Sequence, residues 1–372
     1  MSGAPLRVLL VSGSLPPMRC GVGDYTAGLA RALAETGATE VAVLTSRLQG
    51  RTDAGRWEGV EMLEPIGRWR TSGLAAALGS VRSWKPHVLH VQHPSQGYDG
   101  PLALQVATAA RWILGVPVVL TLHEPVGVNL QVPVMAAAIR SANAVIVVRP
   151  DFRALVNPKV RWTIMGKPLR LIPNATTLPR AAPTPERARA IRERFRAGTR
   201  NLVAYFGFVY PGRGVHHLFR IADPGRHCLV IVGGKLDEAA AYFEEVCARA
   251  QQADWRGSCS VTGFVPAAEA AEIMACADAV VLPFEAGGGS WNTSLHGARL
   301  QGTFVLTTSR DLRGYDAREN VYYARPGDVE EMRAALAAHL GTRSEPAGLP
   351  TWEQVAAGHL EVYRGVQAAR SR

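Results

Sequence analysis

Short apolar runs alternate with amphipathic stretches along most of the chain and fall into two series. In the first series, runs of strand length lie at residues 7–12, 41–45, 88–92, 118–122, 144–148 and 169–172. Helical periodicity predicts helices between them, among them 25–34, 72–84 and 102–114. This alternation is typical of a parallel sheet covered by helices on both faces.

A second series of the same kind begins at Leu202. Strands are expected at residues 202–206, 228–232, 258–262, 279–283 and 304–307. Helices are expected at residues 215–221, 238–250, 266–275, 293–300 and 329–340. The fold class is therefore α/β, with two doubly wound, Rossmann-like domains.

A proline-rich segment, residues 176–185, separates the two series and is typical of a linker. Thr184 followed by Pro185 predicts the start of a charged helix over 186–196. A last helix is expected over 351–369. We therefore expect domains at 1–178 and 179–350, followed by a C-terminal segment, 351–372. Ligands of such folds bind outside the carboxyl ends of the strands, which places the expected site in a cleft between the domains.

Composition narrows the class of protein. The chain has 372 residues, of which 47% are hydrophobic and 19% charged, which is ordinary for a globular enzyme. No apolar run reaches the length of a membrane span, and the N-terminal run is too short for a signal peptide, so a cytoplasmic protein is expected. Five scattered cysteines without a CxxC pair make a zinc knuckle or redox motif improbable.

The net charge of +10 comes from 41 basic and 31 acidic residues. The arginines are dispersed and form no recognisable nucleic-acid motif, so no nucleic-acid partner is expected. The charge instead favours an anionic small molecule, with peripheral membrane association as an additional option. Nothing in the sequence sets the oligomeric state.

Residues 7–37 hold the most informative motif. An apolar strand leads through a loop with Gly13, Gly21 and Gly23 into a helical pattern. A glycine loop lets the backbone approach a ligand, and a helix start offers free N–H groups to an anion. This motif predicts a ligand that carries phosphate; a tight turn that packs strand against helix is the structural alternative.

Further motifs follow in order: GVGDYT (21–26), TLHEP (121–125), IPNA (172–175), FGFVYPGRGV (206–215), VTGFVP (261–266), LPF (282–284) and SLHGARLQGTFVLTT (294–308). With them the chain resembles the GT-B glycosyltransferases of retaining family four (glycosyl transferases group 1) over nearly its whole length. The resemblance implies an N-terminal acceptor domain, a C-terminal nucleotide-sugar domain and a final helix that packs back on the first domain. It also implies a UDP- or GDP-sugar donor, a hydroxyl-bearing acceptor (small molecule, lipid or saccharide), and neither metal nor other cofactor.

The resemblance assigns roles to individual residues. His123, Arg213 and Glu285 are the expected catalytic residues, with Arg213 in place of the usual lysine. The expected donor contacts are Gly21, Gly23, Gly207, Arg213, Gly287, Gly288, Gly289, Ser290, Asn292 and Thr293. The expected acceptor contacts are Asp24, Tyr25, His93, His123 and Glu124. Asp24 has a structural alternative as a stabiliser of the helix start, and His93 as a packing residue.

Two positions depart from the family pattern. The family's pair of glutamates, counted back from Gly302, falls on Gly289 and Gly297, and Glu285 is the nearby carboxylate that could replace the first. Phe208 stands where many relatives have a second basic residue, which Lys235 could replace unless it is a solvated loop lysine. Two alternatives therefore stay open: a non-catalytic GT-B binding protein with a degraded donor site, and a GT-B epimerase or phosphorylase.

Overall fold

The structure is a computed structural model that describes residues 4–47, 55–195, 197–198, 200–289 and 291–370. The chain forms two compact units. Unit 1 comprises Met1–Ala175 together with Pro350–Arg372, and unit 2 comprises Thr176–Leu349.

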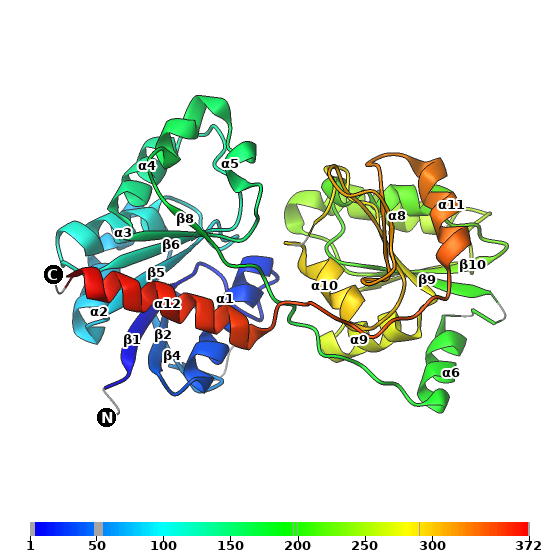
Figure 1. Ribbon diagram of the computed structural model, residues 1–372, viewed down its shortest axis with the longest axis horizontal. Coiled ribbons are helices and arrows are strands. Elements are labelled where there is room, and N and C mark those ends of the chain that lie inside the picture. The colour runs from blue at the N-terminus through cyan, green and yellow to red at the C-terminus, as the bar shows by residue number, and fades with distance from the viewer. Residues whose placement is uncertain (1–3, 48–54, 196, 199, 290, 371–372) are drawn as a thin grey trace. The chain divides into compact units, whose positions relative to one another are not determined.

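Unit 1 is built on an eight-stranded sheet with the order β3-β4-β2-β1-β5-β6-β7-β8 (Figure 1). All neighbouring strands are parallel except the β3–β4 pair at one edge. The strands are β1 (Leu6–Val11), β2 (Thr39–Ser46), β3 (Arg56–Trp57), β4 (Val60–Ile66), β5 (Val88–His93), β6 (Val118–Leu122), β7 (Ala144–Val147) and β8 (Leu169–Leu171). Its helices are α1 (Gly21–Glu35), η1 (Thr71–Gly73), α2 (Leu74–Trp84), α3 (Leu102–Trp112), α4 (Val132–Ser141), α5 (Phe152–Leu155), η2 (Pro158–Ile164) and α12 (Trp352–Arg370).

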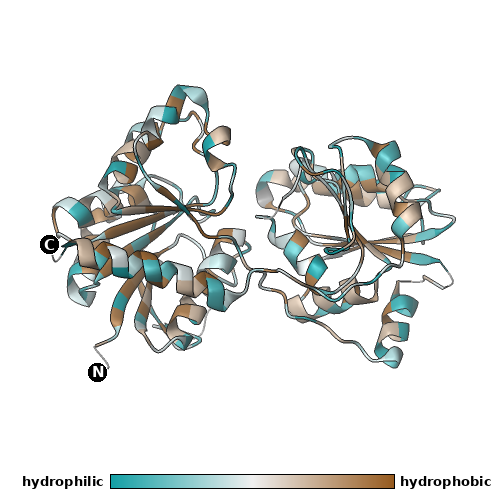
Figure 2. Cartoon of the chain, in the orientation of Figure 1, coloured by the Kyte–Doolittle hydropathy of each residue, from teal (hydrophilic) through white to brown (hydrophobic). Residues whose placement is uncertain are grey.

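Alternate residues of the unit 1 strands enter two separate cores. Val8 and Leu10 pack with residues of α1 and α12, whereas Leu9 and Val11 pack with residues of α2, α3 and α4. The central strands β1, β6 and β7 are accordingly mostly apolar on both faces, and Figure 2 shows hydrophobic residues along the middle of the sheet. The C-terminal helix α12 lies directly on α1, where a Cβ at Gly28 would come within 2.4 Å of the Trp352 ring.

Unit 2 contains a seven-stranded sheet with the order β11-β10-β9-β12-β13-β15-β14, parallel except for the β14–β15 pair. Its strands are β9 (Asn201–Phe206), β10 (His227–Val232), β11 (Cys259–Gly263), β12 (Ala279–Leu282), β13 (Val305–Thr308), β14 (Gly314–Asp316) and β15 (Val321–Ala324). Its helices are α6 (Pro185–Arg194), η3 (Pro211–Arg213), η4 (Val215–His217), α7 (Leu218–Ile221), η5 (Asp237–Ala239), α8 (Ala240–Ala250), α9 (Ala267–Cys276), α10 (Thr293–Leu300) and α11 (Val329–His339).

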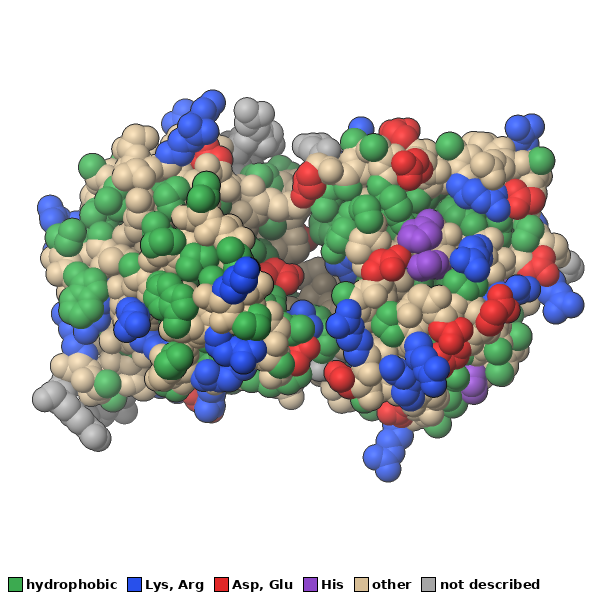
Figure 3. Space-filling model, turned by 90° about the horizontal axis from the view of Figure 1, so that it is seen from above, with side chains coloured by type: hydrophobic (Ala, Val, Ile, Leu, Met, Phe, Trp, Pro, Cys, Tyr) green, Lys and Arg blue, Asp and Glu red, His purple; other side chains and the backbone are tan. Residues whose placement is uncertain are grey.

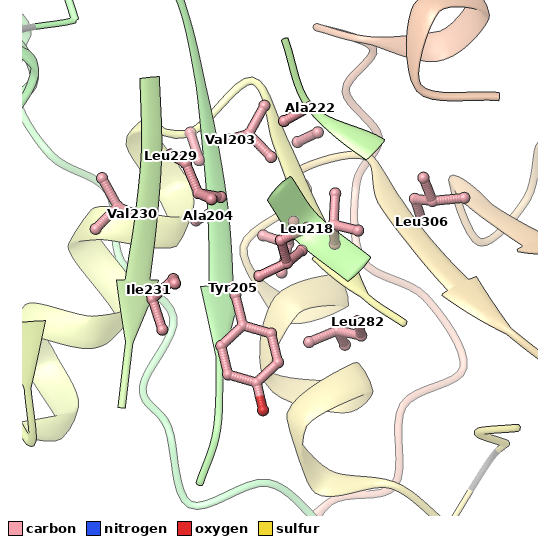
Figure 4. Packing of buried hydrophobic residues seen from close by; sticks show 14 of the residues in the cluster. Val203, Ala204, Tyr205, Leu218, Ala222, Leu229, Val230, Ile231, Leu282 and Leu306 are labelled. Atoms are coloured by element: carbon pink, nitrogen blue, oxygen red, sulfur yellow. The ribbon is translucent and has the colours of Figure 1, made fainter. Parts of the chain in front are cut away.

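The core of unit 2 surrounds β9, an inner strand of its sheet. Val203 and Tyr205 of β9 are fully buried beside Leu229 of β10, Leu218 of α7 and Leu282 of β12 (Figure 4). The Tyr205 hydroxyl donates a hydrogen bond of 2.8 Å to the carbonyl of Phe208, just beyond the strand. The core therefore extends to the carboxyl end of β9 and holds the turn that follows it.

The doubly wound α/β fold predicted from the sequence is confirmed, and each predicted strand overlaps an observed one. The helix start at residue 184 is also confirmed, because the Thr184 hydroxyl accepts a hydrogen bond from the Arg187 N–H and Pro185 occupies the first turn. None of the described helices has the length and hydropathy that crossing a membrane requires.

The structure corrects two expectations. The helix expected at 25–34 begins at Gly21, four residues earlier, so Gly21 and Gly23 belong to its first turn and not to the preceding loop. The helix expected at 215–221 is two short pieces, η4 and α7.

Candidate functional site

Glycines close the loops at the carboxyl end of the unit 2 sheet. Gly207 and Gly233 follow β9 and β10 with positive φ angles of 141° and 155°, and a Cβ at Gly233 would lie 1.8 Å from the Gly207 carbonyl oxygen. A Cβ at Gly214 would lie 2.0 Å from the carbonyl oxygen of Pro283, after β12. Only glycine permits these approaches. The three loops therefore form one closely packed backbone surface.

Arg213 lies in this surface, in the turn after β9. Its guanidinium carbon is 5.4 Å from the ring centre of Tyr210 and 5.1 Å from that of Phe284. Its Nε is buried and has no hydrogen-bond partner, and the side chain forms no ion pair with any described residue. Two aromatic rings thus hold a permanent cation that none of the described carboxylates neutralises, which leaves its charge available to an anionic ligand.

Glu285 begins the glycine-rich loop after β12. Its backbone N–H donates to the Gly212 carbonyl at 3.2 Å, which joins this loop to the turn that carries Arg213. Its carboxylate Oε1 lies 3.0 Å from His217 Nε2 and 3.6 Å from His216 Nε2. Glu285 therefore faces two histidines that the sequence analysis did not single out; the HH pair at 216–217 was the available signal.

The glycine-rich loop itself is tightly packed. Gly287 has a positive φ of 82°, and the Gly288 N–H donates to the Thr308 carbonyl at 2.7 Å. A Cβ at Gly288 or Gly289 would meet the ring of Phe284 or Trp291 within 2.5 Å. Ser290 lies outside the described residues. The two aromatic rings occupy the space that side chains at these glycines would need.

Asn292 caps α10. Its side-chain oxygen accepts hydrogen bonds from the N–H groups of Ser294 and Leu295, while Thr293 is exposed at the start of the helix. A Cβ at Gly207 would lie 3.2 Å from the Ser294 hydroxyl, so this helix start adjoins the turn after β9. Two N–H groups in the first turn of α10 therefore already have an acceptor within the protein.

The structure also shows what occupies the positions that depart from the family pattern. A Cβ at Gly297 would lie 2.6 Å from Leu178 and 3.2 Å from the Thr176 hydroxyl, so the linker fills the space of a longer side chain. Phe208 packs edge-on against Phe264 with ring centres 5.6 Å apart. Lys235 is exposed, as expected for a solvated loop lysine.

In unit 1, candidate residues come together where β1, β5 and β6 end. His123 follows β6, and its backbone N–H donates to the backbone carbonyl of His93, the last residue of β5. The imidazole lies edge-on to the Tyr25 ring at 4.8 Å. Glu124 is exposed beside it. His123, His93 and Tyr25 thus occupy one corner of the unit.

His123 is buried, and burial lowers its pKa to about 3, with His93 and His359 adding a smaller effect. The imidazole is therefore neutral at physiological pH. Its Nε2 lies 2.8 Å from the amide oxygen of Gln92, which can only accept, so Nε2 carries the hydrogen and Nδ1 keeps its lone pair. His123 can accept a hydrogen bond from a hydroxyl group.

A polar network that the sequence analysis missed holds His123 in place. The Gln92 amide nitrogen lies 3.1 Å from His90 Nε2, and His90 Nδ1 lies 2.7 Å from the Tyr363 hydroxyl of α12. His90, Gln92 and Tyr363 are all completely buried. Polar residues inside the strand VLHVQH were the signal, but their partner comes from a helix more than 270 residues away.

The start of α1 lies in the same unit. Gly21, Val22 and Gly23 form its first turn, whose N–H groups lack intrahelical acceptors, and Cys20 provides no side-chain cap. A Cβ at Gly23 would lie 3.0 Å from the Ser14 carbonyl oxygen. Asp24 follows, and burial raises the pKa of its carboxyl group to about 6. A carboxyl group that titrates near neutrality is suited to exchange a proton with a ligand.

The raised pKa of Asp24 predicts how the free energy of unfolding depends on pH. Its folded pKa is above the unfolded value of 3.8, so the ionised group destabilises the fold above pH 6 and the penalty disappears below pH 4. Asp24→Asn is expected to raise the free energy of unfolding at pH 8 by at most about 3 kcal/mol, with no gain at pH 4.

Urea unfolding of both proteins at several pH values checks this expectation. Glu35→Gln, at an exposed position of the same helix, is the control. A gain in stability that is the same at pH 4 and pH 8 would show that burial does not set the titration of Asp24.

Comparison with known proteins identifies the fold. The model of the glycosyl transferase 4-like domain matches residues 20–175. No curated protein sequence matches the chain. Among solved structures, sucrose-phosphate synthase from Thermosynechococcus elongatus is 19% identical, with a TM-score of 0.76 over 98% of this chain and 100% of that one.

The chain is a GT-B fold protein, and its residues 20–175 match the model of a glycosyl transferase 4-like domain. Two further GT-B structures are similar. HepE of Anabaena in complex with UDP-glucose is 15% identical, with a TM-score of 0.69 over 98% of this chain and 99% of that one. The catalytic domain of starch synthase IV from Arabidopsis thaliana, bound to ADP and acarbose, is 14% identical, with a TM-score of 0.70 over 98% of this chain and 100% of that one. The GT-B fold thus extends over the whole chain.

Proposed function

We propose that this GT-B protein is a retaining glycosyltransferase that moves a sugar from a nucleotide-diphosphate sugar to a hydroxyl-bearing acceptor. The observation that carries the proposal is Arg213, a cation held by Tyr210 and Phe284 without a carboxylate partner among the described residues. It lies at the carboxyl end of a parallel sheet, where such folds bind their ligands. The glycosyl transferase 4-like match and the similar structures with UDP, UDP-glucose and ADP support the same choice.

The proposed donor site lies in unit 2. The leaving diphosphate would lie against the turns at Gly207 and Gly287 and meet the Arg213 guanidinium, which stabilises the charge that develops as the sugar departs. Glu285, with Gly288, Gly289, Asn292 and Thr293 beside it, would face the sugar or the nucleotide. We propose UDP or GDP as the nucleotide and no metal ion in the transfer step.

The proposed acceptor site lies in unit 1. Neutral His123 would accept a hydrogen bond from a hydroxyl group through Nδ1, and Asp24 would exchange a proton with it. Tyr25, His93 and Glu124 would line the acceptor. The N–H groups at Gly21 and Gly23 would meet phosphate oxygens. The acceptor oxygen would attack the face from which the diphosphate departs, so the configuration is retained without a protein nucleophile.

A thermal-shift panel with UDP-, GDP-, ADP- and dTDP-sugars tests the donor assignment. A donor that binds only the folded chain at 100 times its Kd is expected to stabilise it by about 2.7 kcal/mol. The sugars of one nucleotide should raise the melting temperature, and those of the other three should leave it unchanged. A panel in which no nucleotide raises the melting temperature would contradict the proposal.

A binding protein without activity is the second candidate. Gly289 and Gly297 stand where the family pattern has glutamates, and Leu178 fills the space at position 297. Release of free nucleoside diphosphate from the stabilising donor distinguishes the two functions. Product without an acceptor, or with inorganic phosphate alone, would instead indicate an epimerase or a phosphorylase.

Unit 1 offers a surface that fits the proposed peripheral membrane association. Residues 101–170 contain eight Lys or Arg and only two Asp or Glu. Trp112, Ile113 and Met165 are exposed hydrophobic side chains in this segment, at 69%, 69% and 75%.

Hydrogen bonds bring the ends of three helices of this segment together on one face. The Trp112 indole at the end of α3 donates to Ser141 of α4, and Lys167 Nζ, after η2, donates to the carbonyl of Arg140 in α4. Figure 3 shows apolar and basic side chains interspersed over the exposed face of unit 1. Interfacial aromatic and basic residues favour an anionic lipid surface.

Reversing two of these charges should weaken membrane binding. The double change Arg140→Glu and Arg161→Glu is expected to lower affinity for vesicles of phosphatidylcholine with phosphatidylglycerol by at least about 30-fold, since each basic residue near the surface contributes about 1 kcal/mol and each glutamate adds repulsion. Vesicle co-sedimentation at fixed salt measures it. Arg220→Glu in unit 2 is the control, and vesicles of phosphatidylcholine alone should bind neither protein. Equal binding of the wild type to both vesicle types would refute the lipid assignment.

The cytoplasmic location stays a prediction. All five cysteines are free thiols, and four of them are buried, which fits a reducing compartment.

A further inference from the structure

Two consecutive histidines and a glutamate form a compact cluster on unit 2. His216 and His217 end η4, and Glu285 follows β12. Across the described residues, theirs is the one group of three His, Cys, Asp or Glu side chains whose candidate ligand atoms all lie within 4.8 Å of one another. Histidine and acidic side chains are neighbours on the face of this unit that Figure 3 shows.

The spacing of the three side chains fits a single cation. Glu285 Oε1 is 3.0 Å from His217 Nε2 and 3.6 Å from His216 Nε2. A tetrahedral ion with bonds of about 2.0–2.1 Å separates its ligand atoms by about 3.4 Å. The two observed distances lie on either side of that value, so small side-chain rotations would bring all three atoms into a first coordination shell.

His217 lacks the hydrogen bonds that a buried imidazole needs. Its side chain is only 12% exposed, and both Nδ1 and Nε2 are without a hydrogen-bond partner among the described residues. The 3.0 Å contact with Glu285 is short, but it does not have the angle of a hydrogen bond. Buried polar atoms without partners are rare because they lose their hydration without compensation. A bound cation would supply the missing partner.

Tyr242 orients the other histidine. Its hydroxyl accepts a hydrogen bond of 3.1 Å from the His216 backbone N–H and lies 2.8 Å from His216 Nδ1. When the hydroxyl accepts the Nδ1 hydrogen, Nε2 keeps a lone pair on the side that faces Glu285.

We propose that His216, His217 and Glu285 bind a divalent transition-metal ion of the zinc class. Two imidazoles and one carboxylate form a donor set suited to Zn²⁺ and Co²⁺, whereas Mg²⁺ and Ca²⁺ select oxygen ligands. His216 is 50% exposed and Glu285 40% exposed, so a fourth position is open to water. The inference rests on these side chains alone and is independent of glycosyl transfer.

A bound ion would join two loops of unit 2. The Glu285 N–H already donates to the Gly212 carbonyl, and Arg213 is the next residue in that turn. An ion between Glu285 and the histidines would add a second connection and restrict the turn that carries Arg213. Coordination through Oε1 leaves Oε2 free to face another ligand.

The experiment uses the full chain, treated with a chelator and studied without any donor. Co²⁺ is titrated in while its visible absorption is recorded, and Zn²⁺ is then added. The expected result is one ion per chain, with the absorption of a site of low coordination number that Zn²⁺ removes. His217→Ala and Glu285→Gln should each weaken Co²⁺ binding by about 100-fold or more, and Tyr242→Phe by about 10-fold to 100-fold, the range for residues that support a ligand.

Controls separate a built site from surface binding. Glu244→Gln, at an exposed position on α8, removes the same charge as Glu285→Gln and should bind Co²⁺ like the wild type. His216→Ala, at a half-exposed position, gives a second ligand variant should His217→Ala fail to fold. Absence of a stoichiometric Co²⁺ signal, or a signal that survives both histidine changes and Glu285→Gln, would overturn the proposal. Because no donor is present, neither outcome affects the proposed transfer reaction.

Discussion

Arg213→Ala is expected to weaken binding of the stabilising nucleoside diphosphate by about 100-fold. Removing one partner of a desolvated charge pair costs about 2–5 kcal/mol, and about 3 kcal/mol corresponds to this change in Kd. No other cation of unit 2 is expected to compensate, since Phe208 packs against Phe264 where relatives have a second basic residue. Isothermal titration calorimetry measures the affinity.

Two further variants define what Arg213 contributes. Arg213→Lys should retain part of the affinity, because it keeps the charge and loses the planar fork between Tyr210 and Phe284. Arg220→Ala, at an exposed position on the following helix, is the matched control and should bind like the wild type. Unchanged affinity in Arg213→Ala would show that the diphosphate lies elsewhere.

His123→Ala is expected to lower the turnover number by about 100-fold while the donor Kd changes by less than about threefold. Loss of a positioned proton acceptor costs about 100-fold or more, and His123 belongs to unit 1, whereas the proposed donor residues belong to unit 2. Release of nucleoside diphosphate in the presence of acceptor measures turnover, and calorimetry measures donor binding.

Two further variants separate loss of the His123 imidazole from damage to the fold. His87→Ala removes an exposed histidine just before β5, at the end of the strand opposite His93, and should leave turnover unchanged. Gln92→Ala should lower turnover without removing the imidazole, because Gln92 Oε1 fixes the His123 ring. Equal losses of turnover and donor affinity in His123→Ala, together with a lower melting temperature, would indicate damage to the fold.

Much of the fold could be predicted because its central strands are buried on both faces and read as continuous apolar runs. Strands at the edges carry no such signal: β4 reads VEMLEPI, with charged residues along it, and β14 spans only Gly314–Asp316. The start of α1 was placed late because its glycines suggested a loop.

The candidate site was less predictable because its decisive features are contacts between side chains, most of them from distant parts of the chain. The sequence pointed to Arg213 but not to the rings of Tyr210 and Phe284 that hold it. It pointed to His123 but not to Gln92, whose amide determines which imidazole nitrogen carries hydrogen. Spacing along the chain does not encode such contacts, which arise only when strand ends meet.

The most direct test of the account is a crystal structure of the chain with the nucleotide-diphosphate sugar selected by the thermal-shift panel. The account predicts diphosphate oxygens within hydrogen-bond distance of the Arg213 guanidinium, against the turns at Gly207 and Gly287. A bound nucleotide whose phosphates lie away from Arg213, with the guanidinium still enclosed by Tyr210 and Phe284, would contradict it.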